Sequence, residues 1–291
     1  MKKILCTCCV ALLFMISGCK DAVSGISDES TALITIGNTK ITKGDIYEGL
    51  KSQGAVTSII NKVSAIIVEK EIPLTDEIKK EAEESLATLK TYVGEEKWEQ
   101  FLKDTGYATE EDYFNERVLL AARSGKITDK YLADDFANII AKYKPMQVQV
   151  FETDSEETAT KALAMIKEGK EVKDVVTELE AITENFNGET QVLTNENGLP
   201  ANVWANVSKI TEPNTVIDQI QFNLDLTSFY VVKVIDSNAE NFKDLAIKVM
   251  ATNQTIQDDA FAYYLNKYNF TLYDIDAFNA FKVQAPNYIV Q

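Results

Sequence analysis

Few side chains in this 291-residue chain could act as nucleophiles or general bases. The sequence has no histidine, which removes the usual general base and the commonest metal ligand. Catalysis by carboxylates would remain, but the acidic residues are scattered along predicted helix faces without an obvious pair. The thiols all lie near the start of the chain, at Cys6, Cys8, Cys9 and Cys19. Their spacing could hold a metal or a redox pair, but their setting is typical of a targeting segment.

That segment begins with a positive pair, Lys2 and Lys3, and continues with an uncharged stretch from Ile4 to Ile16. The stretch is shorter than the roughly 20 apolar residues that a membrane-spanning helix needs. Ile16-Ser17-Gly18-Cys19 follows and resembles the lipobox of bacterial lipoproteins. The resemblance implies cleavage before Cys19 and attachment of acyl chains, such as palmitate, to that residue. A plain secretory signal is the alternative. We therefore expect a signal peptide over 1–18 and a lipidated, flexible tether over 19–31.

The charge of the chain is −16, from 29 basic and 45 acidic side chains. This balance argues against nucleic acid as a partner, because phosphates require a basic surface. It also argues against docking of the protein surface on anionic lipid. A solvated exterior is the simplest reading of the acidity.

The stretch 146–237 differs in pattern from the chain on either side. Met146–Phe151 alternates and predicts a strand, and Ser228–Ile235 predicts a second, more apolar strand. Between them lie two short helical patterns, an Asn187-Gly188 turn and an asparagine-rich passage. The chain before and after reads as mostly helix, ending in a strand candidate over Phe270–Ile275 and an unassigned tail. The predicted fold class is α+β, with 146–237 between helical arms over 32–145 and 238–291.

Local sequence in this stretch resembles parvulin-type prolyl isomerases. Glu156–Lys161 and Ile166–Lys170 are similar to the first parvulin helix and its glycine stop, and Phe229–Val234 is similar to the closing strand. Together with the lipobox, the stretch Asn38–Lys43 and the helical arms, the chain resembles PrsA-type foldase lipoproteins and the related SurA-type chaperones. The resemblance implies a helical chaperone domain formed from both arms, with a parvulin-like domain in the middle.

The positions that would carry isomerase chemistry depart from that family. By position, its two histidines fall on about Val148 and on Tyr230, and a family glycine falls on Ser228. A Gly-Asp-Leu-Gly run is reduced to the four residues 188–191. A prolyl isomerase must bind the twisted amide better than either planar isomer. We therefore predict a degenerate module with little or no isomerase activity.

Four aromatic residues of the first arm are the candidate client-binding residues: Trp98, Phe101, Tyr113 and Phe114. They could line an apolar cradle for unfolded segments, or they could simply seal the core of short helices. The sequence leaves both readings open.

These observations predict a membrane-anchored foldase or holdase on the extracytoplasmic face, which binds unfolded exported polypeptides. No cofactor, metal or nucleic acid is expected. One alternative is an active parvulin-type isomerase. A second is a solute-binding or adhesion lipoprotein, although the first arm lacks the repeated βαβ units expected of that class.

Overall fold

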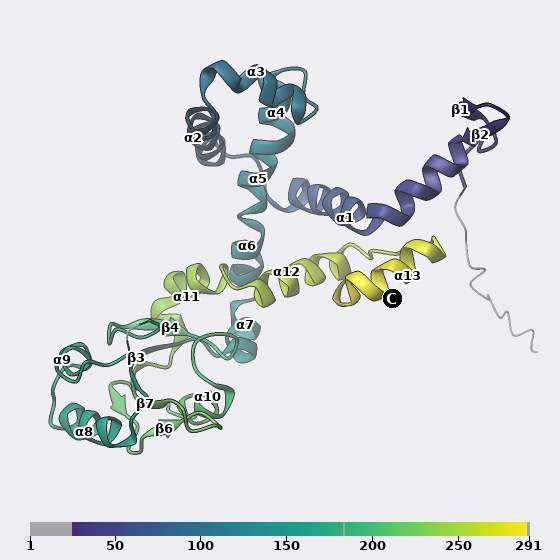
Figure 1. Cartoon of the computed structure of the whole chain (residues 1–291). Coiled ribbons are helices and arrows are strands. Elements are labelled where there is room, and N and C mark those ends of the chain that lie inside the picture. The colour runs from purple at the N-terminus through teal and green to yellow at the C-terminus, as the bar shows by residue number, and fades with distance from the viewer. Residues whose placement is uncertain (1–24, 183, 290–291) are drawn as a thin grey trace, which may run out of the picture. The chain divides into compact units, whose positions relative to one another are not determined.

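The computed structural model describes residues 25–182 and 184–289, with the side chains of residues 52 and 53 left aside. The signal peptide, the lipobox and Cys19 therefore lie outside the described residues. The chain divides into two compact units, one before residue 62 and after residue 268, the other over residues 62–268. Figure 1 shows the order of the elements.

The first unit joins the two ends of the chain. It holds the hairpin of β1 (Ala32–Ile36) and β2 (Thr39–Thr42), the first part of α1 (Lys43–Glu71), α13 (Ile275–Gln284) and a 3₁₀ turn, Pro286–Tyr288. Thr42 caps α1, because its Oγ1 accepts from the backbone N–H of Asp45 at 3.2 Å. Lys51 of α1 pairs with Asp276 of α13 at 2.8 Å.

The helical part of the second unit begins with the end of α1. It continues through α2 (Asp76–Val93), α3 (Glu95–Asp104), α4 (Glu110–Tyr113), a π-helical turn (Phe114–Val118), α5 (Leu119–Ser124), α6 (Ile127–Asp134) and α7 (Phe136–Tyr143). Threonine side chains cap two of these helices: Thr75 accepts from the N–H of Ile78, and Thr109 from that of Asp112.

The last arm packs back on the first within this unit. After the 3₁₀ turn Ala239–Phe242 come α11 (Lys243–Met250) and α12 (Gln254–Lys267), which contact α6. Tyr143 donates to Asp259. The buried carboxylate of Glu71 accepts from Lys267 and, at 2.7 Å, from Tyr268. We call these two groups of contacts the polar seam. It joins segments of the chain on both sides of the central stretch, as the predicted fold class requires.

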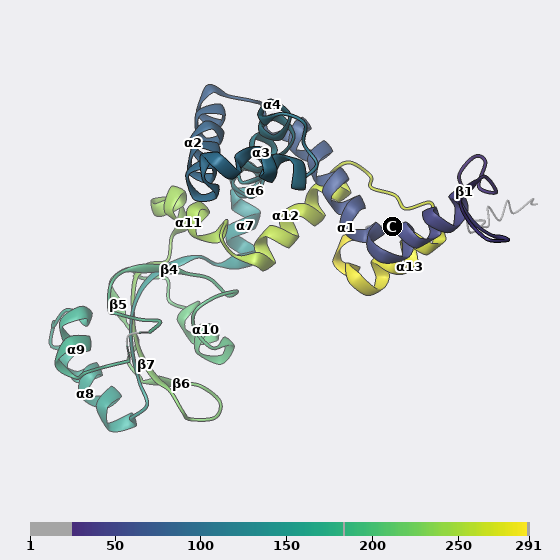
Figure 2. The same cartoon turned by 45° about the horizontal axis from the view of Figure 1, so that its top comes forward.

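The central stretch forms one antiparallel sheet with helices on both of its faces. The strand order is β4 (Gln191–Leu193), β3 (Met146–Thr153), β7 (Phe229–Asp236) and β5 (Thr215–Val216), with β6 (Gln221–Phe222) also paired to β7. All pairs are antiparallel. Helices α8 (Glu156–Lys167) and α9 (Val172–Glu178) cover one face, and α10 (Ala201–Val207) covers the other (Figure 2). The α+β class is confirmed.

Strand alternation divides the apolar side chains between two cores. Val148, Val150, Val232 and Val234 pack with Trp204 of α10. Phe151, Val231 and the buried residues of α8 and α9 form the other core. In the first half of β3, Met146, Val148 and Val150 are buried on one face, whereas Gln147 and Gln149 on the other face are half-buried.

Residues 43–71, labelled α1, are two helices on either side of Gly54, where the backbone leaves helical geometry. One local expectation differs from the structure. The predicted strand over Phe270–Ile275 is wrong: no strand forms there, and α13 begins at Ile275 with Asp274 as its cap. The unassigned tail after residue 275 is largely this helix. Apolar periodicity was weak there, because only Phe281 of α13 is buried.

Candidate functional site

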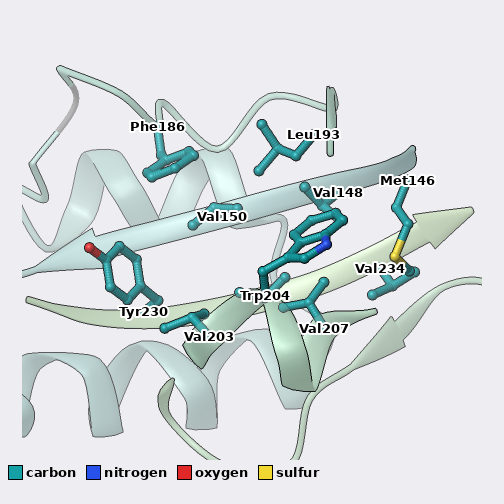
Figure 3. Close-up of a cluster of buried hydrophobic side chains, with 11 residues drawn as sticks. Met146, Val148, Val150, Phe186, Leu193, Val203, Trp204, Val207, Tyr230 and Val234 are labelled. Atoms are coloured by element: carbon teal, nitrogen blue, oxygen red, sulfur yellow. The ribbon is translucent and has the colours of Figure 1, made fainter. Parts of the chain in front are cut away.

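The two positions that the parvulin resemblance singles out both lie in the core beneath α10 (Figure 3). Val148 is on β3 and Tyr230 is on β7, and both are buried. The register places Val148 opposite Val234, whereas Tyr230 lies opposite Glu152. Four residues of strand, or about 13 Å, therefore separate Val148 from the position that faces Tyr230. The structure does not bring these two predicted residues together.

Tyr230 instead belongs to a polar row that crosses three strands. Directly paired residues share a face of the sheet, so Glu152 of β3, Tyr230 of β7 and Gln221 of β6 lie side by side. Gln221 accepts a hydrogen bond from Asn206 of α10 at 2.9 Å. One carboxylate oxygen of Glu152, Oε2, is buried without a hydrogen-bond partner among the described residues. An unpaired buried carboxylate oxygen is unfavourable, so it marks the row as unusual.

The electrostatics of this row keep the Tyr230 hydroxyl protonated. Burial raises the pKa of Tyr230; a hydrogen bond with Ser228 lowers it, and the neighbouring Glu152 carboxylate raises it again, so that the net pKa is above the ordinary value of 10.0. A neutral phenol can donate one hydrogen bond to an amide but cannot exchange protons near pH 7. All three residues of the row are at most 7% exposed. A peptide would reach them only after the covering segments moved.

Sequence reasoning missed Glu152 and Gln221. The alternation of β3 places Glu152 on the same face as Val148 and Val150, and this signal was readable. The pairing with Tyr230 was not readable, because register between strands that are distant in the sequence depends on the whole fold.

The loop between β6 and β7 displays apolar side chains beside this row. Leu224 is 87% exposed, Leu226 is 58% exposed and Phe222 is 46% exposed. We call residues 222–228 the apolar loop. It is an ordered turn: the Asn223 side-chain oxygen accepts from the N–H groups of Thr227 and Ser228 at 2.9 and 3.0 Å, and its amide donates to Thr227 Oγ1 at 2.8 Å.

The backbone of the apolar loop is strained at one of the exposed leucines. Leu226 has φ of 57°, in the left-handed region that leucine rarely adopts. This conformation costs about 1–2 kcal/mol for a residue with a Cβ. A leucine kept in strain and in water is a feature that stability alone does not explain, and such outliers cluster at functional surfaces.

Three of the four aromatic residues proposed for client binding, Trp98, Phe101 and Tyr113, contact one another between α3 and α4, and Phe114 begins the π-helical turn. Trp98 stacks on Phe101 with ring centroids 5.1 Å apart, and Tyr113 meets both rings edge-on. Trp98 is buried; Phe101, Tyr113 and Phe114 are half-buried. This arrangement serves as the core of a small helical subdomain, and it leaves only parts of three rings accessible.

Glu110 fixes the orientation of the Trp98 indole. Its carboxylate accepts from Lys90 Nζ at 2.8 Å and from Trp98 Nε1 at 2.7 Å. The hydrogen bond from Lys90, opposed by burial and reinforced by Trp98, holds the pKa of Glu110 below its ordinary value. The Trp98 ring is therefore held in place by a charged partner as well as by packing.

Neither metal chemistry nor a membrane span is evident in the part of the chain that the structure describes. Within residues 25–182 and 184–289, no three His, Cys, Asp or Glu side chains gather as metal ligands would. Over the same residues, no helix has both the length and the apolar character needed to cross a bilayer.

The known proteins that this chain is similar to are all solved structures. No family model and no curated protein sequence matches the chain. The foldase protein PrsA from Streptococcus pneumoniae is 17% identical and covers 89% of this chain and 100% of its own, with a TM-score of 0.40. The peptidylprolyl isomerase PrsA from Bacillus cereus is 14% identical over 87% and 98%, with a TM-score of 0.48. PrsA from Bacillus subtilis is 16% identical over 88% and 100%, with a TM-score of 0.39.

The similar solved structures are thus of the PrsA type, which is the family that the sequence resembles. Identities below 25% and TM-scores below 0.5 do not carry an activity from one protein to another. The function must therefore be argued from the residues of this chain.

Proposed function

We propose that this protein is a foldase or holdase that binds unfolded exported polypeptides, and that it is anchored by lipid on Cys19 to the extracytoplasmic face of a membrane. The lipobox-like Ile16–Cys19 supports the anchor. PrsA structures are described as foldases and peptidylprolyl isomerases, which agrees with a role in folding of other chains.

The observation that carries the proposal is the apolar loop. Leu224 and Leu226 stand in water on a turn that Asn223 holds in shape. Unfolded polypeptides share apolar side chains but no common polar geometry, so an exposed apolar surface is what binding them requires. Each contact is weak, and several together give useful affinity. The acidic exterior, with 45 acidic against 29 basic side chains, would favour cationic clients.

Substitution of the two leucines by asparagine tests this role. Asparagine tolerates the left-handed conformation better than leucine does. Leu226→Asn should therefore leave stability unchanged or raise it by about 1 kcal/mol, while the double variant Leu224→Asn/Leu226→Asn loses client binding. The measurement is suppression of aggregation of an unfolded exported protein, followed by light scattering.

The matched control is Val283→Asn, because Val283 is 83% exposed on α13 and far from the loop in the sequence. We expect Val283→Asn to suppress aggregation as the wild type does. Equal suppression by the wild type and the double leucine variant would remove the main support for the proposal.

We propose further that isomerase activity is weak or absent. The polar row offers a neutral tyrosine hydroxyl where the resembled family has an imidazole, and the row is buried. A protease-coupled assay with a proline peptide should show turnover at least about 100-fold below that of an active parvulin, since losing a preorganised hydrogen-bonding group that stabilises the transition state commonly reduces rates by about 10²–10³. Turnover at the level of an active parvulin would establish the alternative, a working isomerase.

A further inference from the structure

A cavity of about 410 Å³ lies where the helical part of the second unit meets the central sheet. Its walls come from α7, the connection Lys144–Met146, the turn after α10 and the segment after β7. The volume is within the range of sites that bind small ligands or anchoring side chains. Both connections between the helical part and the sheet contribute to it, so an occupant would contact both parts at once.

The floor and one wall of this cavity are apolar. Pro145, Met146 and Ala239 are buried beneath it. On α7, Ala137 and Ala141 lie four residues apart and therefore on one face of the helix, and both are exposed. The cavity is open on this side because Ala137 and Ala141 carry only methyl groups. A large apolar side chain of a ligand would fit into the cavity.

The rim is polar and braced. Ser237 Oγ donates to the carbonyl oxygen of Thr211 at 2.8 Å, which ties two walls of the cavity together. Asn238 Oδ1 accepts from the N–H of Glu240, and the Asn238 N–H donates to Asp236 at 2.8 Å. The opening is thus held in shape before any ligand arrives, which favours binding.

The charge of the lining is opposite to that of the chain as a whole. Lys144 is the one charged residue among those that line the cavity. Across residues 25–182 and 184–289, its ammonium makes no ion pair, whereas the nearby Lys142 is paired with Asp259 at 2.5 Å. The Asp236 carboxylate keeps its charge but is not among the lining residues, and its oxygens accept from the Asn238 N–H and from Asn241 Nδ2, both at 2.8 Å. The charge of the lining itself is therefore complementary to an anion.

The backbone at Lys144 is also unusual. Lys144 follows α7 with φ of 48°, a position where glycine or asparagine is the common choice. A lysine there could serve only to stabilise the C-terminus of α7 through the helix dipole. That reading explains a positive charge, but it does not explain an adjoining apolar cavity that lacks acidic residues.

We propose that this cavity binds an extended internal segment of a polypeptide, with a large apolar side chain in the cavity and an aspartate or glutamate side chain one or two residues away on Lys144. This inference rests on the proposed function and adds to it a client chemistry opposite to the one that the overall charge favours. A salt bridge at a partly exposed lysine is weak, so we expect a several-fold preference rather than an absolute one.

The test is binding of short fluorescent peptides to the full-length protein in lipid nanodiscs, measured by anisotropy. Three capped peptides differ at one position only: Phe-Ser-Asp, Phe-Ser-Asn and Phe-Ser-Lys in a Gly/Ser background. We expect the Asp peptide to bind about 5-fold more tightly than the Asn peptide, and the Lys peptide to bind most weakly. Equal binding of all three to the wild type would overturn the proposal.

Variants of the protein test which residues cause the preference for the Asp peptide. Lys144→Asn keeps a residue that tolerates positive φ and should reduce the Asp-to-Asn preference to about 1. Lys209→Asn removes an exposed lysine that contacts Asn206 and should keep the preference. Ala141→Trp should fill the cavity and weaken all three peptides at least tenfold, whereas Ala87→Trp on the exposed face of α2 should not. A preference that survives Lys144→Asn, or binding that survives Ala141→Trp, would place the site elsewhere.

A fourth peptide, with Phe-Ser-Asn and a free C-terminus, separates an internal carboxylate from a terminal one. Stronger binding of this peptide than of the capped Asp peptide would contradict the choice of an internal segment. The outcome is also independent of the foldase proposal, because peptide preference can be present in a protein that fails to suppress aggregation. If the wild-type protein fails to suppress aggregation but still prefers the Asp peptide to the Asn peptide, the proposed function is refuted and the peptide site in this cavity stands.

Discussion

Replacing Tyr268 by phenylalanine should weaken the polar seam between the two arms by a measurable amount. The change removes one hydroxyl, whose hydrogen bond to the Glu71 carboxylate is 2.7 Å long, and keeps the ring. A hydrogen bond to a charged group contributes about 1.5–3 kcal/mol. Tyr268 is 37% exposed, so water replaces part of the loss, and we expect a decrease of about 1 kcal/mol in the free energy of unfolding.

Glu71→Gln removes more of the same group of contacts. It abolishes the ion pair with Lys267 and the weaker interaction with Lys130 at 3.9 Å. Breaking a fully buried ion pair costs about 3–5 kcal/mol, but both lysines are more than 30% exposed, so we expect about 2 kcal/mol. Because Tyr268 donates to this carboxylate, the double variant should be less destabilised than the sum of the two, with a coupling of about 1 kcal/mol.

The coupling should vanish in acid. Burial raises the pKa of Glu71. The hydrogen bonds from Lys267 and Tyr268 and the charges of Lys267 and Lys130 together lower it by more than burial raises it, so the net pKa is below 4.5. A carboxyl whose folded pKa is depressed contributes stability above its unfolded pKa and loses it as pH falls through the folded value. The difference between wild type and Tyr268→Phe should therefore be full at pH 7 and shrink below about pH 4.

Urea denaturation at pH 7.0 and at about pH 2, followed by circular dichroism, measures these energies. The control is Tyr92→Phe, because Tyr92 is 89% exposed and its hydroxyl should matter little. A coupling below about 0.3 kcal/mol at pH 7, or one that is the same at both pH values, would show that the seam does not join the arms in the way described.

Three further predictions concern separate parts of the chain. Gly188→Ala should destabilise the protein by about 3 kcal/mol in urea denaturation, because the added Cβ would lie 2.6 Å from the Lys173 Cα and Gly188 has φ of 79°; an unchanged midpoint would contradict this. Trp98→Phe should reduce the unfolding free energy by about 2 kcal/mol through lost packing and the lost bond to Glu110, and a change below 0.5 kcal/mol would refute the bracing role. Cys19→Ser should move the protein from the membrane fraction to the soluble fraction on cell fractionation, and full retention would argue against the lipid anchor.

Local signals in the sequence predicted much of the fold. Ser155 caps α8 by accepting from the N–H of Thr158, and Gly169 follows the helix end with φ of 97°. Such features depend on neighbours within four residues, so they can be read directly. The alternation of Met146–Phe151 likewise predicted β3, because a strand with one fully buried face places apolar residues at every second position.

The candidate sites depended on contacts that no local pattern records. The facing of Tyr230 and Glu152 follows from the register of β3 against β7, which the sequence leaves open. Leu224 and Leu226 were not among the predicted site residues, and only the structure shows that they stand in water. The cavity at Lys144 arises where two connections meet, and those connections are distant in the sequence.

The polar seam has a consequence for how the chain folds during its synthesis. Tyr143 and its partner Asp259 are 116 positions apart. At a synthesis rate of roughly 5–20 residues per second, the first arm would wait on the order of ten seconds for the last. During that wait the buried side of α6 and α7, with Leu132 and Tyr143, has nothing to cover it. A newly synthesised copy thus exposes the same kind of apolar surface as the clients proposed for the folded protein. A folded copy nearby would be able to bind it.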